Sequence, residues 1–242
     1  MKPLLILKTG STLPDIAEAR GDFEDWISLG LGFDASEFEV ASVYEGDSLP
    51  DPASVSGVVI TGSSALVTER EDWSERSARW LPQVVEGEIP VLGICYGHQL
   101  LAHALGGRVE RNPLGREIGT VDVRFANGFE DDALLGVLPK DISVQVSHIE
   151  SVVTLPKGAT HRGVSSGDLN QAFGYGSNAW GVQFHPEFDA DIVRGYINGR
   201  RPLLVDEGLD AEALLRAAHD TDHGTQLLRR FGEIVRAHVT KE

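Results

Sequence analysis

Residues 89 to 97 read Ile-Pro-Val-Leu-Gly-Ile-Cys-Tyr-Gly, an apolar run ending in a cysteine that has a glycine two positions away on either side. The run from Ile89 to Ile94 is typical of a buried strand. The segment from Gln99 to Leu105 has good helix formers and stops at Gly106-Gly107. A strand, a sharp turn and a helix in this order predict that the Cys95 side chain projects at the edge of a sheet, because the flanking glycines let the backbone turn tightly.

Three earlier apolar runs also predict strands, at Leu4 to Lys8, Phe38 to Tyr44 and Gly57 to Thr61. Before the strand that ends at the cysteine, Thr68 and Glu71 form a capping-box pattern that predicts the start of a helix. Apolar residues follow it at helical spacing: Trp73, Trp80, Leu81, Val84 and Val85. Strands alternating with helices predict βαβ units and a parallel sheet, whose carboxyl ends should share one edge.

The second half of the chain has a different pattern of apolar and polar residues. Residues 108 to 180 contain short alternating segments, such as Thr120 to Phe125 and Ile142 to Val146, which predict added antiparallel strands. The last 40 or so residues predict two amphipathic helices. We therefore expect an α/β fold, an open and mostly parallel sheet flanked by helices with added antiparallel strands. We divide it into one domain over residues 1–200 and a helical extension over 201–242 that packs on the same domain.

The composition excludes several classes of function. The 242 residues include 37 Asp and Glu against 21 Lys and Arg, a formal charge of -16 that disfavours binding to nucleic acid. The first apolar run is too short for a secretory signal and no stretch is long enough to span a bilayer, so we expect a cytoplasmic protein that binds no membrane. A single cysteine excludes an internal disulfide and disfavours a cysteine-ligated metal site. We expect no metal and no cofactor.

Cys95 either packs as a small buried residue or acts as a nucleophile. A thiol with an ordinary pKa of about 8.5 is only a few per cent thiolate at neutral pH, so a nucleophile needs a nearby base. The best-placed base is His185, because it follows the strand-like run Gly181 to Phe184 and should fall on the same sheet edge. Beyond the rigid Pro186, Glu187 can accept a hydrogen bond from the second imidazole nitrogen. These residues predict a Cys-His-Glu triad.

The other histidines are weaker candidates for the base. His98 and His103 lie on the predicted helix after the cysteine, where packing or solvent exposure is the commoner role. His148 comes at the end of a strand-like run and is a candidate pocket residue. No partner can be identified from the sequence for the remaining four: His161, His219, His223 and His238.

A nucleophilic attack on a carbonyl also needs donors for the oxyanion that forms. The turn Thr61-Gly62-Ser63-Ser64 after the third strand can supply backbone N–H groups. We predict that the amides of Ser63 and Tyr96 form this pair, although an ordinary turn at the end of a strand is the alternative interpretation.

The segment Gly93 to Gln99 and the tripeptide His185-Pro186-Glu187 resemble the two motifs of the class I, triad-type glutamine amidotransferases, and the similarity extends to about residue 190. The resemblance implies that Cys95 forms a γ-glutamyl thioester and releases ammonia. It also implies that Gln99 and the backbone near Ser147 and His148 help to hold the substrate. Arg116-Glu117-Ile118-Gly119 is similar to a segment of the GMP synthase amidotransferase domain. The subgroup that the chain resembles is the GMP-synthase-like stand-alone proteins, which include γ-glutamyl peptidases.

No phosphate-binding loop and no Ser-Gly-Gly-x-Asp-Ser segment of the ATP pyrophosphatase type is present, so no motif for activating an ammonia acceptor can be found. The first hypothesis is an amidohydrolase that takes glutamine, with a possible synthase partner chain receiving the ammonia. The alternative with the same chemistry is a peptidase that cleaves γ-glutamyl peptides or conjugates. A third hypothesis is a non-catalytic regulatory or binding subunit that keeps the fold.

Overall fold

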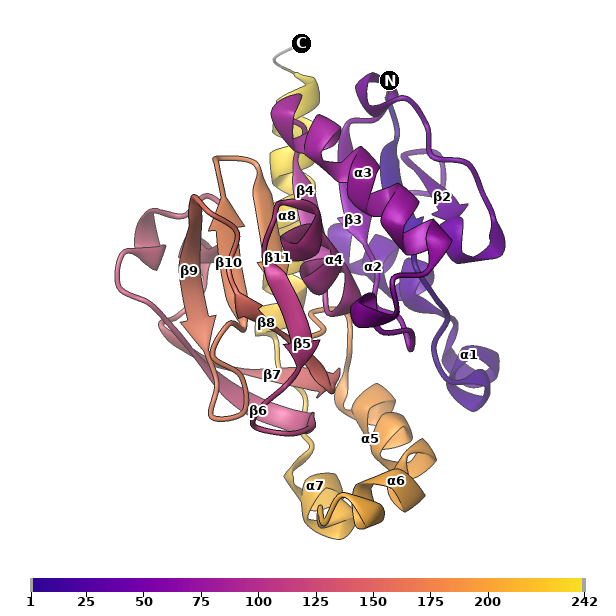
Figure 1. Cartoon of the computed structure of the whole chain (residues 1–242), viewed down its shortest axis with the longest axis vertical. Coiled ribbons are helices and arrows are strands. Elements are labelled where there is room, and N and C mark those ends of the chain that lie inside the picture. Colours follow the sequence, from indigo (N-terminus) through magenta and orange to yellow (C-terminus); the bar gives the residue numbers. More distant parts are fainter. Residues whose placement is uncertain (1, 241–242) are drawn as a thin grey trace.

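The fold is organised around one nine-stranded sheet (Figure 1), seen in a computed structural model that describes residues 2–240. The strand order is β2-β1-β3-β4-β11-β10-β9-β6-β7. These strands are β1 (Leu4–Lys8), β2 (Phe38–Ser42), β3 (Gly57–Ile60), β4 (Val91–Ile94), β6 (Glu117–Phe125), β7 (Asp141–His148), β9 (Ala159–Val164), β10 (Ala172–Tyr175) and β11 (Ala179–Val182). A separate antiparallel pair is formed by β5 (Arg108–Arg111) and β8 (Glu150–Thr154).

The sheet is parallel in one half and antiparallel in the other. Strands β2, β1, β3, β4 and β11 run parallel to one another, and β11 then pairs antiparallel with β10. The remaining pairs in the sheet, β10 with β9, β9 with β6 and β6 with β7, are antiparallel. The expected α/β class, with a parallel sheet and added antiparallel strands, is confirmed.

Helices cover both faces of the parallel half (Figure 1). Alternate residues of β1 show this directly, because Leu4 and Ile6 belong to one apolar core and Leu5 and Leu7 to the other. The first core also contains residues of α2 (Phe23–Leu31) and α8 (His223–Val239). The second contains residues of α3 (Asp72–Glu86) and α4 (Tyr96–Ala104). Strands β1, β3, β4 and β11 are buried throughout, which explains their largely apolar runs, whereas the edge strand β2 is mostly exposed or half-buried.

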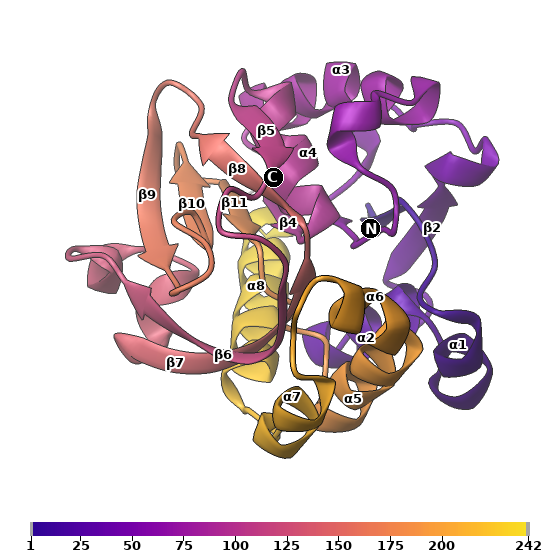
Figure 2. The same ribbon diagram turned by 60° about the horizontal axis from the view of Figure 1, so that its bottom comes forward.

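Further short helices complete the chain. Helix α1 (Pro14–Arg20) follows β1, and α5 (Ala190–Gly199), α6 (Arg201–Asp206) and α7 (Ala211–Ala217) form a compact group (Figure 2). The C-terminal region therefore holds more helices than the two predicted from its apolar spacing. None of the helices over residues 2–240 is both long and apolar enough to cross a membrane.

The predicted capping box at Thr68 and Glu71 is wrong. The residues Val67–Glu69 form a 3-10 turn, Arg70 adopts a left-handed conformation with φ of 54°, and α3 begins only at Asp72. The reason is tertiary: the hydroxyl and the amide of Thr68 both donate to the carboxylate of Glu150, which lies 82 residues further along the chain. Because the Thr68 side chain is bonded to Glu150, it cannot accept a hydrogen bond from the amides at the start of α3.

Candidate active site

Cys95 lies in a sharp turn between β4 and α4. Its backbone has φ of 52° and ψ of -102°, a conformation that a non-glycine residue rarely adopts and that costs about 1–3 kcal/mol. A Cβ atom on Gly97 would lie 2.3 Å from the carbonyl oxygen of Ile60, and one on Gly93 would lie 2.4 Å from the carbonyl oxygen of Gly97. Glycine is therefore needed on both sides of the cysteine, as the sequence pattern predicts.

His185 reaches the same place because β11 lies beside β4. The amide of Cys95 donates to the carbonyl of Val182 at 2.9 Å, and the amide of His185 donates to the carbonyl of Gln145 at 2.8 Å. The Nδ1 atom of His185 lies 2.7 Å from Oε1 of Glu187, and both side chains are buried. Since Nδ1 is bonded to the carboxylate, Nε2 is the nitrogen that remains for the thiol of Cys95, and the charges of the imidazole and the thiol act on each other.

The His185 ring is fixed by packing. Phe188 stacks on it with ring centroids 4.0 Å apart and planes 11° from parallel. On another side, a Cβ atom on Gly62 would lie 2.8 Å from Cε1 of the ring, so only glycine allows the turn after β3 to approach this closely. Stacking, the carboxylate and the turn together leave the imidazole little freedom to rotate.

Electrostatics favour an ion pair between cysteine and histidine. Burial opposes the charged thiolate, but the positive charge of His185, its hydrogen bond and the charge of His148 outweigh this cost and lower the pKa of Cys95. Burial also opposes the charged imidazole, but the carboxylate of Glu187 and then Cys95 raise the pKa of His185 to about 10. Between these two pKa values the pair holds a thiolate beside an imidazolium.

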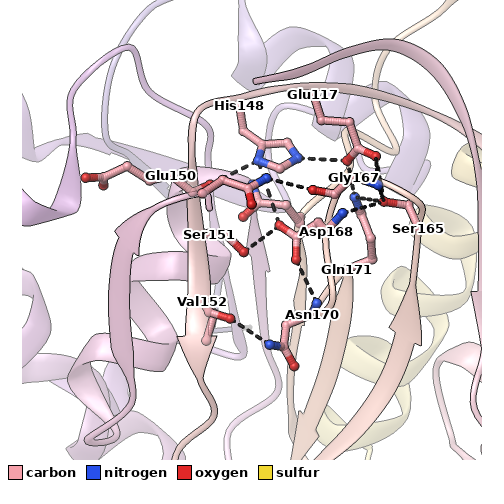
Figure 3. Close-up of polar contacts among 12 residues, drawn as sticks. Glu117, His148, Glu150, Ser151, Val152, Ser165, Gly167, Asp168, Asn170 and Gln171 are labelled. Atoms are coloured by element: carbon pink, nitrogen blue, oxygen red, sulfur yellow. Dashed lines mark hydrogen bonds and ion pairs between the residues drawn. The ribbon is translucent and has the colours of Figure 1, made fainter. Parts of the chain in front are cut away.

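His148 is a second buried imidazole and is held by a polar network (Figure 3). Its Nδ1 atom lies 3.0 Å from the carbonyl oxygen of Glu150, and its Nε2 atom lies 3.0 Å from Oε2 of Glu117. Glu117 also accepts hydrogen bonds from Ser165, Gly167 and Gln171, as a carboxylate does.

Because both ring nitrogens of His148 face acceptors, each must carry a proton, and the ring is an imidazolium. Burial opposes this charge, but the hydrogen bond to Glu117 and the charge of Asp168 raise the pKa of His148. Ser151 in turn donates to Asp168 at 2.7 Å. His148 therefore supplies a second positive charge near Cys95.

Two neighbouring cavities open at this site. The first is lined by Cys95, Tyr96, Gln99 and His148 together with Ser63, Ser64, Ala65, Leu66, Arg116, Ser147, Ile149, Glu150 and Arg200. The second is lined by His185 together with Ser11, Thr12, Leu13, Pro14, Phe23, Ser63, Ser64, Ser147, Tyr196 and Arg200. All the residues predicted for oxyanion or substrate binding thus border the first cavity.

The predicted binding residues are available to different degrees. The amides of Ser63 and Tyr96 have no hydrogen-bond partner in the part of the chain that the structure describes. Gln99 uses its amide nitrogen on the carbonyl of Glu150 and on the Gln183 side chain, both at 2.9 Å. Its role in binding a substrate stays a prediction, as do those of Ser147 and of the oxyanion pair.

The remaining histidines lie outside this arrangement. His98 is fully buried, its ring centroid lies 5.0 Å from that of Phe173, and burial lowers its pKa to about 3, so it is neutral. His103 lies 3.0 Å from a carboxylate oxygen of Glu75. Over residues 2–240, no three His, Cys, Asp or Glu side chains are grouped so that they could hold a metal ion.

Sequence reasoning missed Arg200 and Asp168. Arg200 borders both cavities, and Asp168 is completely buried beside the His148 network. Neither has a local sequence signal, because an arginine near a helix end and an aspartate in a loop are most often solvated. Only the packing of distant segments gives them a role.

Known proteins share the sequence pattern and the fold of this chain. The profile of the family described as glutamine amidotransferase class-I matches residues 36–192. The GMP synthase [glutamine-hydrolyzing] of Thermosipho africanus is 33% identical over 189 residues, which is 77% of this chain and 33% of that protein. The corresponding protein of Bacillus pumilus is 37% identical over 149 residues, which is 59% of this chain and 27% of that protein. The chain thus spans about a third or less of the length of these relatives.

Solved structures resemble nearly the whole chain. A glutamine amidotransferase from Thermotoga maritima has a TM-score of 0.76 at 25% identity, with 97% of this chain and 98% of that chain covered. A glutamine amido transferase from Methylobacillus flagellatus has a TM-score of 0.74 at 24% identity, with 100% and 95% covered, and this likeness concerns the fold alone.

Proposed function

The chain belongs to the glutamine amidotransferase class-I family, and we propose that it hydrolyses the side-chain amide of glutamine through a thioester on Cys95. The observation that carries this proposal is the buried row of Cys95, His185 and Glu187, in which the carboxylate lies 2.7 Å from the imidazole. A binding module has no need of a strained cysteine turn, a fixed base and a buried carboxylate together.

In the proposed reaction the thiolate of Cys95 attacks the γ-carbonyl carbon, and the electron pair of the C=O bond moves to the oxygen. The amides of Ser63 and Tyr96 donate hydrogen bonds to this oxyanion. The N–H of His185 then protonates the leaving amine as the C–N bond breaks, which leaves the thioester and a neutral imidazole. A water molecule, deprotonated by His185, then attacks the thioester carbon, and the C–S bond breaks. Glutamate leaves, and the thiolate of Cys95 and the imidazolium of His185 are restored.

A second candidate is hydrolysis of γ-glutamyl peptides or conjugates. The cavity beside His185 favours it, because the proton donor stands where the leaving amine departs and the cavity gives that amine space. Ammonia needs no such space, whereas an amino acid or peptide does. If glutamine is the donor, we propose that a synthase partner chain takes up the ammonia, since the segments that match this chain cover only 33% and 27% of the named relatives.

The test is covalent labelling followed by a comparison of donors. The glutamine-like electrophile 6-diazo-5-oxo-L-norleucine should add one equivalent to the purified protein, detectable by intact-mass spectrometry, and the Cys95→Ala variant should remain unlabelled. Glutamate release from glutamine and from γ-glutamyl peptides then ranks the two donor classes. A protein that is neither labelled nor active, alone or with candidate synthase chains, would show that it is a non-catalytic subunit.

A further inference from the structure

Arg200 stands between the two cavities of the site. It follows the last residue of α5 and precedes the first residue of α6, in the group of short helices seen in Figure 2. Its side chain lines the cavity that contains Cys95 and also the cavity that contains His185. The residue lies outside the segment that matches the family profile, which ends at residue 192. The family profile therefore does not account for it.

The guanidinium of Arg200 forms no ion pair with any residue that the structure describes, although the charges of Cys95 and Glu207 act on it favourably from a distance. Its Nε atom is buried without a hydrogen bond, and no hydrogen bond or ion pair of its side chain exists among residues 2–240. The guanidinium lies over the aromatic ring of Tyr196 in a cation–π contact, with Cζ 5.4 Å from the ring centroid. Burial, and after it the charge of Arg116, lowers the pKa of Arg200, so the guanidinium is held in an unfavourable environment.

Arg116 offers a direct comparison, because it lines the first cavity but is neutralised. Its Nε and Nη2 atoms lie 2.7 and 3.2 Å from the two carboxylate oxygens of Glu207. Glu207 is thus occupied in a two-point bond and does not bond to Arg200. A partly buried cation that lacks such a partner is costly unless a ligand supplies the missing charge.

We propose that Arg200 is a specificity-determining residue that binds a carboxylate group of the acyl donor. A guanidinium presents paired N–H donors that match the two oxygens of a carboxylate. This inference rests on the proposed function. A γ-glutamyl donor held at Cys95 carries such a group at its α-carbon, within the first cavity. A γ-glutamyl peptide carries another on its leaving amine, on the His185 side.

Four acyl donors can show whether Arg200 binds the α-carboxylate of the γ-glutamyl group or the carboxylate of the leaving amine. L-Glutamine and γ-L-glutamylmethylamide have only the α-carboxylate, γ-L-glutamylglycine has both carboxylates, and L-glutamine α-amide has neither. The kcat/KM of wild type, Arg200→Gln and Arg200→Lys should be measured with each. Arg201→Gln is the matched control, because Arg201 is the next residue, lines neither cavity and pairs with the exposed Glu212. Thermal unfolding of each variant checks that the fold is intact.

If the α-carboxylate is bound, Arg200→Gln should lower kcat/KM by about 10- to 100-fold for every donor except the α-amide, with most of the change in KM. If the leaving-group carboxylate is bound, the loss should be confined to γ-L-glutamylglycine. Arg200→Lys should recover part of either loss, because it restores the charge without the paired donors. An equal loss for all four donors, or no loss for any, overturns the proposal.

The same comparison can be made without turnover. Calorimetric titration of the four compounds into Cys95→Ala, with and without Arg200→Gln, should show a weaker Kd only for the compounds that carry the recognised carboxylate. This result can be positive even if the protein cleaves none of them, so failure of the proposed reaction and failure of the Arg200 proposal are distinguishable. Binding that is unchanged by Arg200→Gln for all four compounds refutes the role of Arg200.

Discussion

The Nε2 atom of His148 lies 3.0 Å from the Oε2 atom of Glu117, and both side chains are buried. Since the opposite ring nitrogen also faces an acceptor, this contact fixes a charged imidazole near the proposed nucleophile. The network around Glu117 therefore sets the charge of the site as well as the packing of β6 against β7.

Replacing Glu117 with Gln should destabilise the protein by about 3–5 kcal/mol, because it leaves the buried charge of His148 uncompensated. The folded-state pKa of His148 is raised, so the stability it contributes is present below the unfolded pKa of about 6.5 and is lost as the pH rises through the folded value. Urea unfolding at pH 6 and pH 9 should show the larger difference between variant and wild type at pH 6. Equal differences at both pH values would contradict a charged His148.

The lowered pKa of Cys95 predicts a thiolate at a pH where an ordinary thiol is protonated. The thiolate absorbance near 240 nm, taken as the difference from Cys95→Ala, should rise with a midpoint below about 8.5. His185→Gln should move that midpoint upward, because it removes the positive charge and the hydrogen bond that outweigh burial. A midpoint that stays the same in His185→Gln would refute the ion pair.

Glu187→Gln should lower kcat by about 10²- to 10⁴-fold, because a neutral amide can no longer stabilise the imidazolium or hold its Nδ1–H. Steady-state glutamate release measures this effect on whichever donor is cleaved. Glu233→Gln is the control, since Glu233 forms an exposed ion pair with Arg230 and lies outside the site. An activity loss of less than tenfold in Glu187→Gln would show that the carboxylate is not the orienting group.

Gly97→Ala should lower the free energy of unfolding by about 1–3 kcal/mol and impair Cys95, because its Cβ atom would lie 2.3 Å from a backbone oxygen of Ile60. Gly174→Ala in β10 should have little effect, since its Cβ atom would lie at an ordinary 3.5 Å from the nearest atom. Chemical unfolding and labelling of Cys95 by the electrophile measure both consequences. A Gly97→Ala protein with wild-type stability and labelling would show that the turn tolerates a side chain.

The parts of the site that depend on local sequence could be predicted. The turn at Cys95 needs small residues at fixed positions, and the strand before it is a continuous apolar run, so residue order alone carries the signal. The pairing with His185 and Glu187 follows from the rule that carboxyl ends of parallel strands share an edge. The resemblance to the family supported the same residues, and the family itself is confirmed.

The parts that depend on distant contacts could not be predicted. Thr68 stands in a sequence pattern typical of a helix cap, but its hydroxyl donates to Glu150 instead. The helices α6 and α7 have too few turns to show a clear apolar periodicity in the sequence. Strand β11 ends at Val182, two residues before the predicted end, because His185 instead pairs with Gln145 of β7. Arg200 acquires its position only when α5 packs near the sheet edge.

The place of β11 in the sheet has a consequence for the order in which the chain matures. β4 pairs with a strand whose residues lie 88 positions later in the sequence, and the proposed base His185 is carried by the segment just after that strand. Contacts of such long sequence separation form slowly, since the intervening loop must first close. On the proposed mechanism, a nascent chain that has just produced Cys95 has no base for its thiol, so we expect the thiol to become reactive only after β11 has paired with β4.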